Sequence, residues 1–171
     1  MDDLKISISN SIKGKLTKLL YNRLYKLKIA KLQHSYLSNW YNKLWSFMIT
    51  IMAVANTVII IVGLLISDEK LKILLSNIFS AVNIFMLGLI TKFNINEKPS
   101  LHKNSKLMVE DIISDLEHSL SRENFTEAAL QALSDIFEEK IKAFRSVEVG
   151  VPFWVKKKIL DNYKKNNEKK G

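Results

Sequence analysis

Three histidines, His34, His102 and His118, are the side chains of this sequence best suited to metal binding or proton transfer. Metal sites and zinc hydrolases place their ligands at characteristic short spacings, often with a glutamate on the same helix. No two of these histidines share such a spacing, and no His-Glu motif accompanies them. For His34 and His102, which lie just outside two apolar segments, we expect ordinary interfacial packing and no metal.

Carboxylates and nucleophiles give no better candidate for catalysis. The acidic pairs Glu110-Asp111 and Glu138-Glu139 fall on expected exposed helix faces, and no serine lies in a nucleophile elbow. The sequence has no cysteine, which excludes a disulfide framework, a cysteine metal site and a cysteine nucleophile. We therefore expect no enzyme activity, no cofactor and no catalytic or metal-binding residues.

Polar residues inside the apolar segments are more informative. In the first segment, hydroxyl and small residues at intervals of four, three and four share one helical face, and an asparagine lies beside it. The second segment has a comparable stripe. Asparagine is costly in hydrocarbon unless its amide finds partners, so these faces should turn towards another helix or towards water. The candidate polar stripe consists of Ser46, Thr50, Asn56, Thr57, Ser76, Asn77, Ser80 and Asn83.

Two functions fit this polar stripe, and the sequence leaves both open. Small and hydroxyl residues allow helices to approach closely and to bond across an interface. Two helices are too few to enclose a pore, but an oligomer could line one with these residues. Since the stripe holds no ring of charge, such a pore would be weakly selective or gated by dewetting.

The segments that carry the stripe predict a transmembrane hairpin over 45–93. Trp45 to Ile66 is a run of 22 uncharged residues, and Ile73 to Ile90 is an uncharged run of 18 within the second span, 71–93. As helices these runs reach about 33 and 27 Å, close to the roughly 30 Å of a bilayer core. Only Ser67-Asp68-Glu69-Lys70 separates the two spans. Because 44 mostly polar residues precede the first run, we expect an uncleaved anchor.

Lysines flank the hairpin on its outer sides, whereas those near the connecting turn are offset by Asp68 and Glu69. The positive-inside rule then predicts a multi-pass membrane protein with both termini in the cytosol. Aromatic side chains before the first span predict an interfacial belt of Tyr36, Trp40, Tyr41 and Trp45.

The remaining residues also predict helices, so the expected fold class is all-α. Region 1–44 is basic and amphipathic, and it either lies on an anionic leaflet or packs against the C-terminal helices. Region 94–165 predicts a helix over 101–121, one capped by Thr126, and a last helix from Pro152 through Tyr163. We expect the Lys- and Asn-rich tail, 166–171, to be disordered. The expected apolar faces of these helices comprise Ile12, Leu16, Leu19, Leu20, Leu24, Leu27 and Leu32, then Leu107, Ile112, Ile113, Leu116 and Leu120, and then Leu130, Leu133, Phe137, Ile141 and Phe144.

Charge is unevenly distributed along the sequence, whose net charge is +9. Residues 1–44 and 140–171 each carry a net +7, while 105–139 carries −7. Lysine dominates over arginine and no nucleic-acid motif is present, so nucleic acid is not an expected partner. We expect the basic ends to meet anionic lipid headgroups and to pair in part with the acidic block.

Several short segments together resemble one known family. The order is an aromatic helix with a histidine, a hairpin with an asparagine in its second span, a second histidine after the membrane, and a proline before the last helix. The segments are His34-Ser35-Tyr36 to Trp45, Val82-Asn83-Ile84-Phe85, Leu101-His102-Lys103, Glu117 to Leu120 and Val149-Gly150-Val151-Pro152-Phe153-Trp154-Val155. This combination over 30–165 is similar to the SLATT two-transmembrane effectors, and closest to the short versions of large DNA viruses.

The resemblance implies a membrane effector that oligomerises and perforates or depolarises a membrane when a cytosolic partner signals. It implies no catalytic residues, and residues 1–29 fall outside the shared pattern. From a different class, the same features fit a non-conducting membrane scaffold or viral envelope protein that binds partners through its charged helices.

Overall fold

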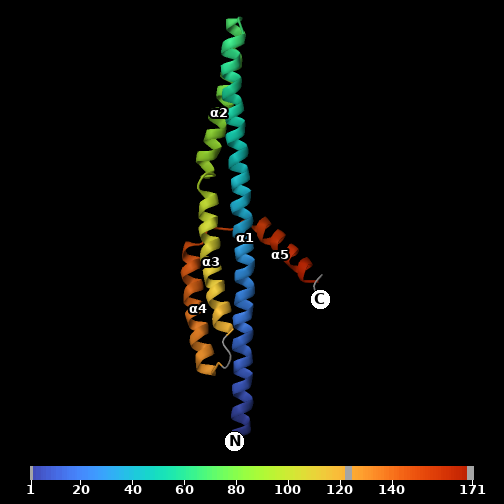
Figure 1. Cartoon of the computed structure of the whole chain (residues 1–171), viewed down its shortest axis with the longest axis vertical. Helices are drawn as coiled ribbons and strands as arrows, with labels where there is room; N and C mark the ends of the chain where they lie inside the picture. Colours follow the sequence, from blue (N-terminus) through green and yellow to red (C-terminus); the bar gives the residue numbers. More distant parts are fainter. Residues whose placement is uncertain (1, 122–124, 169–171) are drawn as a thin grey trace. The chain divides into compact units, whose positions relative to one another are not determined.

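A computed structural model describes residues 2–121 and 125–168, with side chains described for most of 12–121 and 125–165. Within these residues the chain forms five helices and no strand, which confirms the all-α prediction (Figure 1). The helices are α1 (Asp2–Leu65), α2 (Glu69–Phe93), α3 (Lys98–Leu120), α4 (Glu127–Val147) and α5 (Phe153–Glu168). Contacts divide the chain into two units, 38–101 and a second made of 1–37 and 102–171.

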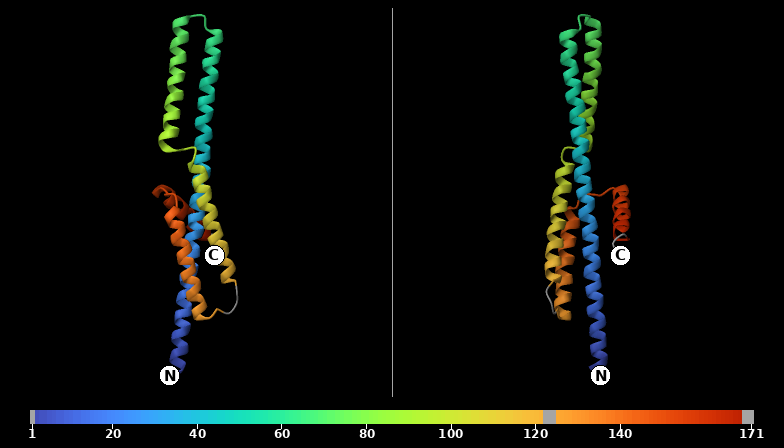
Figure 2. Two further views of the ribbon diagram at one scale, coloured as in Figure 1. Left: turned by 90° about the vertical axis from the view of Figure 1, so that its left-hand side faces the viewer. Right: turned by 45° about the vertical axis from the view of Figure 1, so that its right-hand side comes forward.

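The unit of residues 38–101 is the expected hairpin, with α2 running back along the second half of α1 (Figure 2). The turn is shorter than the expected tetrapeptide, because α1 ends at Leu65 and α2 begins at Glu69. Asp68 is the N-cap of α2, and its carboxylate accepts hydrogen bonds from the backbone N–H groups of Lys70 and Leu71 at 3.0 and 3.3 Å. This cap satisfies two of the donors that a helix start leaves open, so the helix begins directly after Asp68.

The end of α2 is set by Asn94, which has the left-handed φ of 47° that asparagine tolerates well. The Ile95 N–H then donates to the Ile90 carbonyl at 3.1 Å and closes the helix. Helix α3 begins at Lys98, earlier than the expected 101, with Pro99 in its first turn. A proline is favourable there because the first N–H groups of a helix have no partner inside it.

The second unit packs the first half of α1 against α3 and α4 (Figure 2). Its core joins leucines of α1 to residues of both other helices: Leu20, Leu24, Leu27, Val109, Ile112, Ile113, Leu116, Leu130, Phe137 and Phe144. Of the two interpretations of the N-terminal helix, the structure therefore shows packing against the C-terminal helices. Leu19 and Leu32, expected on the apolar face, are exposed, because the buried face follows Leu20, Leu24 and Leu27.

Two helix starts follow their predictions, and one helix end does not. The Thr126 hydroxyl accepts from the Ala129 N–H at 3.2 Å, which confirms this N-cap. The Pro152 carbonyl accepts from the Val155 N–H at 3.1 Å at the start of α5. Helix α5 continues to Glu168, past Tyr163, so the prediction of disorder was wrong for 166–168. The rest of that predicted tail, 169–171, lies outside the described residues.

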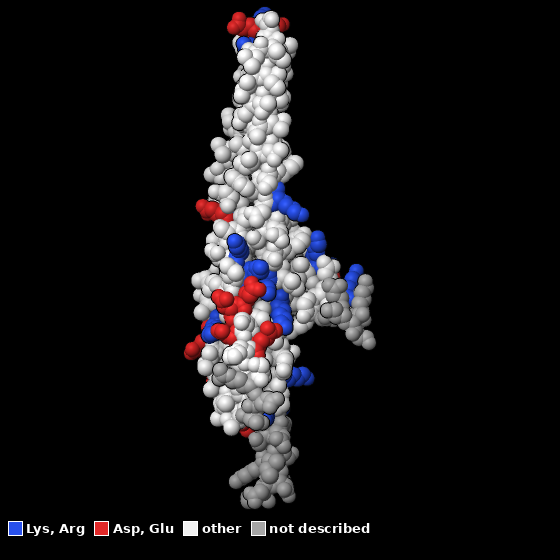
Figure 3. Space-filling view, in the orientation of Figure 1, with Lys and Arg blue, Asp and Glu red and all other residues white. Residues whose placement is uncertain are grey.

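Ion pairs join the basic face of α1 to the acidic faces of α3 and α4 (Figure 3). Lys28 meets Glu117 at 2.7 Å and Lys31 meets Glu110 at 2.6 Å, both with α3. Arg23 meets Glu138 of α4 at 2.8 Å. The expected partial pairing of opposite charge blocks is thus present within one chain.

Candidate functional site

The surface of the hairpin is apolar along both spans, and few residues of its most apolar stretches are buried: 17% in α1 and 6% in α2. Large side chains such as Phe47, Ile60 and Ile84 are more than 60% exposed. Soluble monomeric proteins rarely expose a continuous apolar surface of this kind. By length and composition, these two helices could cross a membrane.

The polar stripe of α1 lies on this surface, since Ser46, Thr50, Asn56 and Thr57 are all exposed. The Thr50 hydroxyl donates to the Ser46 carbonyl at 2.8 Å, and the Thr57 hydroxyl donates to the Ala53 carbonyl at 3.0 Å. These bonds to their own helix satisfy the hydroxyl donors.

One hydrogen bond joins the polar residues of the two spans. The Asn83 Nδ2 donates to the Asn56 Oδ1 at 2.7 Å. The Oδ1 of Asn83 is buried and has no hydrogen-bond partner within the described part of the chain. The asparagine pair therefore links α1 to α2 by a hydrogen bond. The acceptor left without a partner, Asn83 Oδ1, is unfavourable in a membrane interior.

The remaining polar residues of α2 divide between two environments. Ser76 and Ser80 are half-buried, and Asn77 is exposed. Beside the α1 stripe lies a shallow groove of about 230 Å³, lined by Phe47, Thr50, Ile51, Val54, Ala55, Phe79 and Val82. Part of the predicted stripe thus packs within the hairpin, and part stays on its surface.

The aromatic residues of the predicted belt occupy different surroundings. The rings of Trp40 and Tyr41 pack edge to face with centroids 4.9 Å apart, and the Lys98 ammonium lies 5.1 Å from the Tyr41 ring. Trp45 is half-buried against the hairpin core of Met48, Ile90 and Ile95. In the other unit, Tyr36 packs against Trp154 of α5 with centroids 6.0 Å apart.

The structure brings together two histidines that their sequence spacing did not connect. His34 of α1 and His102 of α3 are 0% and 1% exposed, and their Nδ1 atoms lie 3.1 Å apart. The His34 Nε2 lies 3.3 Å from a carboxylate oxygen of Glu148, which follows α4. The Phe144 ring packs edge to face against His34. His118, by contrast, is exposed.

Burial lowers the pKa of His34 below its ordinary value of 6.5, and this outweighs the opposing hydrogen bond and charge of Glu148. His34 is therefore neutral near pH 7. Its Nε2–H donates to the Glu148 carboxylate, which leaves Nδ1 to accept a hydrogen bond from the Nδ1–H of His102. The sequence predicted ordinary interfacial packing for these histidines. The fold buries both rings and joins them with Glu148 in one chain of hydrogen bonds.

Acid is expected to destabilise the unit that holds this pair. A histidine whose pKa is lowered by folding binds its proton more readily in the unfolded chain, so stability is lost as pH falls below about 6.5. The slope should reach at most about 1.4 kcal/mol per pH unit in this range. Urea titration of the full chain in detergent, followed by circular dichroism between pH 7.5 and 5, measures it.

Two variants locate the cause of this slope. The double change His34→Phe/His102→Leu should flatten it, whereas His118→Gln, at an exposed histidine, should leave it unchanged. A slope that persists in the double variant would show that other groups cause it.

No family model, curated protein or solved structure matches this chain. Its function has to be inferred from the geometry of its own residues.

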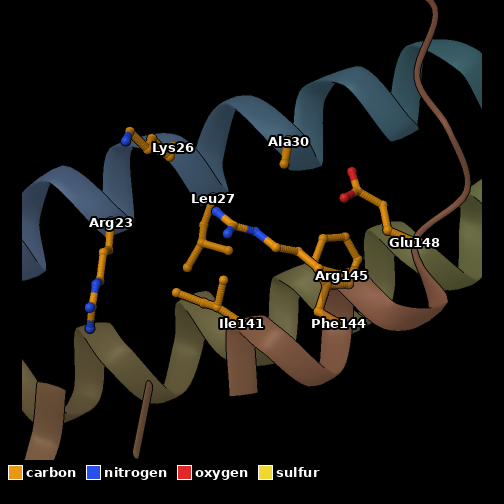
Figure 4. Close-up of a pocket in the computed structure, with 8 residues that line it drawn as sticks. All are labelled: Arg23, Lys26, Leu27, Ala30, Ile141, Phe144, Arg145 and Glu148. Carbon is orange, nitrogen blue, oxygen red and sulfur yellow. The ribbon is translucent and has the colours of Figure 1, made fainter. Parts of the chain in front are cut away.

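A cavity in the unit of 1–37 and 102–171 lies between α1 and α4 (Figure 4). Leu27, Ala30, Ile141 and Phe144 form its apolar lining, and Arg145 reaches across it towards α1. Its volume of about 160 Å³ is below the roughly 300 Å³ at which small-molecule sites begin. Arg23 at its edge is already bound to the Ser134 carbonyl and to Glu138.

The described residues contain no group of three or more histidine, cysteine, aspartate or glutamate side chains that could hold a metal ion. The closest approach to catalytic geometry is His34 with His102 and Glu148. Because both imidazole rings are buried, this chain of hydrogen bonds fits a structural role.

Proposed function

We propose that this protein crosses a membrane twice, assembles with copies of itself and makes the membrane permeable under the control of its helices outside the spans. Both termini would lie in the cytosol, and the protein would not be an enzyme. The observation that carries the proposal is the polar stripe of α1, exposed on a hairpin whose surface is otherwise apolar.

The position of the stripe favours an oligomer. An exposed asparagine such as Asn56 is costly against lipid and is favourable against water or another helix. One hairpin has too few helices to enclose water, so several copies are needed if the stripe lines a pore. The groove beside Thr50 is shallow and has an apolar lining, so a helix of a neighbouring copy could pack in it.

The chain connections between the two units support control of permeability from outside the membrane. Helix α1 belongs to both units, and α3 begins in one unit and continues into the other. A partner that binds the unit of 1–37 and 102–171 therefore acts on a body linked to the first span through α1, and to the second through α3 and the turn over 94–97. This agrees with the resemblance to SLATT effectors, which implies a cytosolic signalling partner.

The asparagine pair favours a second candidate, a non-conducting membrane scaffold. Asn56 and Asn83 bind one another inside a single hairpin, so this part of the stripe already serves packing. In that case the charged helices would bind partners, and the exposed stripe would only hold copies together.

Replacing Asn83 by Leu separates these candidates. The change removes one interhelical hydrogen bond, worth about 0.6 kcal/mol or roughly threefold in an equilibrium constant. If the stripe lines water, the ion permeability of vesicles that contain the protein should change at an unaltered oligomer size. The volume-conserving change Ile84→Leu, on the next residue, should leave both quantities as they were.

Chemical cross-linking reports the oligomer size of each variant. If Asn83→Leu alters only the oligomer and leaves permeability unchanged, the scaffold function replaces the pore.

A further inference from the structure

Helix α5 begins with large apolar side chains that the structure leaves exposed. Phe153 is 79% exposed and Trp154 is 47% exposed, although Val155, next in the chain, is fully buried. Lys156 and Lys157 follow and are exposed. At 100° per residue, Phe153, Lys156 and Lys157 lie on one side of the helix, with Trp154 at its edge.

Contacts with α1 hold the first turns of α5 in place. Tyr36 packs against Trp154, and its hydroxyl lies 3.0 Å from the Lys158 ammonium, which also sits 4.8 Å from the Tyr36 ring. Further along, Tyr163 meets Tyr25 edge to face at 5.3 Å. At 100° per residue, Trp154 and Lys158 lie on one flank of α5 and Tyr163 on the other. Phe153, Lys156 and Lys157, between these flanks, stay exposed and accessible to an external partner.

The position of Tyr36 in the chain indicates which partner. Tyr36 lies nine residues before Trp45, where the uncharged run begins, and α1 is helical throughout this stretch. The nine residues between them limit the separation of Tyr36 from the start of the uncharged run to about 30 Å. Exposed aromatic rings beside lysines are the composition of a helix that binds an anionic membrane surface.

We propose that α5 docks on the anionic face of the bilayer through Phe153, Trp154, Lys156 and Lys157. This inference rests on the proposed membrane placement of the hairpin. It assigns lipid contact to the last helix, whereas the N-terminal helix, the sequence-based candidate, uses its apolar face for the protein core.

Tryptophan quenching by brominated lipids tests the proposal, because the chain has only three tryptophans, Trp40, Trp45 and Trp154. The variant Trp40→Phe/Trp45→Phe leaves Trp154 as the only reporter, and Trp40→Phe/Trp154→Phe leaves Trp45. Both are reconstituted as full chains in vesicles of phosphatidylcholine with 0 to 40% phosphatidylserine, with bromines near the headgroup.

We expect Trp154 to be quenched at least twofold more in anionic than in neutral vesicles, and salt to reduce the difference. The changes Lys156→Glu/Lys157→Glu should abolish it, whereas Lys13→Glu/Lys15→Glu, an equal charge change at exposed lysines of α1, should not. Quenching of Trp45 alone would overturn docking of α5 while leaving the hairpin in the membrane. Absence of quenching at both positions would overturn the membrane placement itself. Blue-shifted but unquenched Trp154 emission that depends on protein concentration would identify a second copy as the occupant and overturn the lipid proposal.

Discussion

Replacing Ile84 by Lys is expected to prevent the second span from entering the membrane in most molecules. Ile84 lies near the middle of α2 and is 73% exposed, so in a bilayer its side chain faces lipid or a neighbouring helix. Exchanging an isoleucine for a lysine at the centre of a span raises the free energy of insertion by about 3–4 kcal/mol. Extraction of cell membranes at alkaline pH measures the inserted fraction.

A matched change distinguishes lipid from water as the surroundings of α2. Ile136 on α4 is also exposed, at 51%, but lies outside the spans, so Ile136→Lys should leave insertion unchanged. Because the sequence has no cysteine, Ser67→Cys in the turn adds a single thiol that an impermeant maleimide labels only from the far side. Equal labelling of the Ile84 and Ile136 variants would contradict a membrane location for α2.

Replacing Phe137 by Ala is expected to destabilise the unit of 1–37 and 102–171 by about 3–5 kcal/mol, the usual cost of truncating a buried phenylalanine. Phe137 is 2% exposed and joins α4 to the leucines of α1 and the apolar residues of α3. The cavity left behind loses contacts on three helices at once. Hydrogen exchange of α4 amides in the full chain in nanodiscs measures the loss as a lower opening free energy.

Phe153 supplies the control for this experiment, since it has the same side chain in the same unit but is 79% exposed. Phe153→Ala should leave the protection of α4 amides within error. If Phe137→Ala costs less than about 1 kcal/mol, the packing of α4 on α1 is not the one described.

Periodicity and local turn chemistry predicted most of the fold, because both depend only on residues close together in the sequence. The face of Leu130, Phe137 and Phe144, the cap at Thr126 and the two apolar helices all follow from such patterns. The errors concern helix ends and the exposed residues Leu19 and Leu32, which were expected on an apolar face. Asp68 caps α2 inside the expected turn, and α3 takes Pro99 into its first turn.

Contacts between residues far apart in the chain could not be predicted from the sequence. His34 and His102 are separated by 68 positions, and nothing in their spacing predicts that their rings meet. The bond between Asn56 and Asn83 likewise depends on how far the two spans shift past one another, which the turn alone does not fix. For the same reason the sequence placed Asn83 on a stripe without showing that it faces α1.

The permeability of protein-containing vesicles tests the central claim most directly. The full chain is reconstituted in vesicles loaded with potassium ions and a small dye, and release is followed as the ratio of protein to lipid rises. Labelling of Ser67→Cys from the far side confirms insertion in the same preparation. We predict that release rises more steeply than linearly with the ratio, as an oligomer requires. Vesicles that stay impermeable at every ratio, with the hairpin inserted, would contradict a permeabilising function.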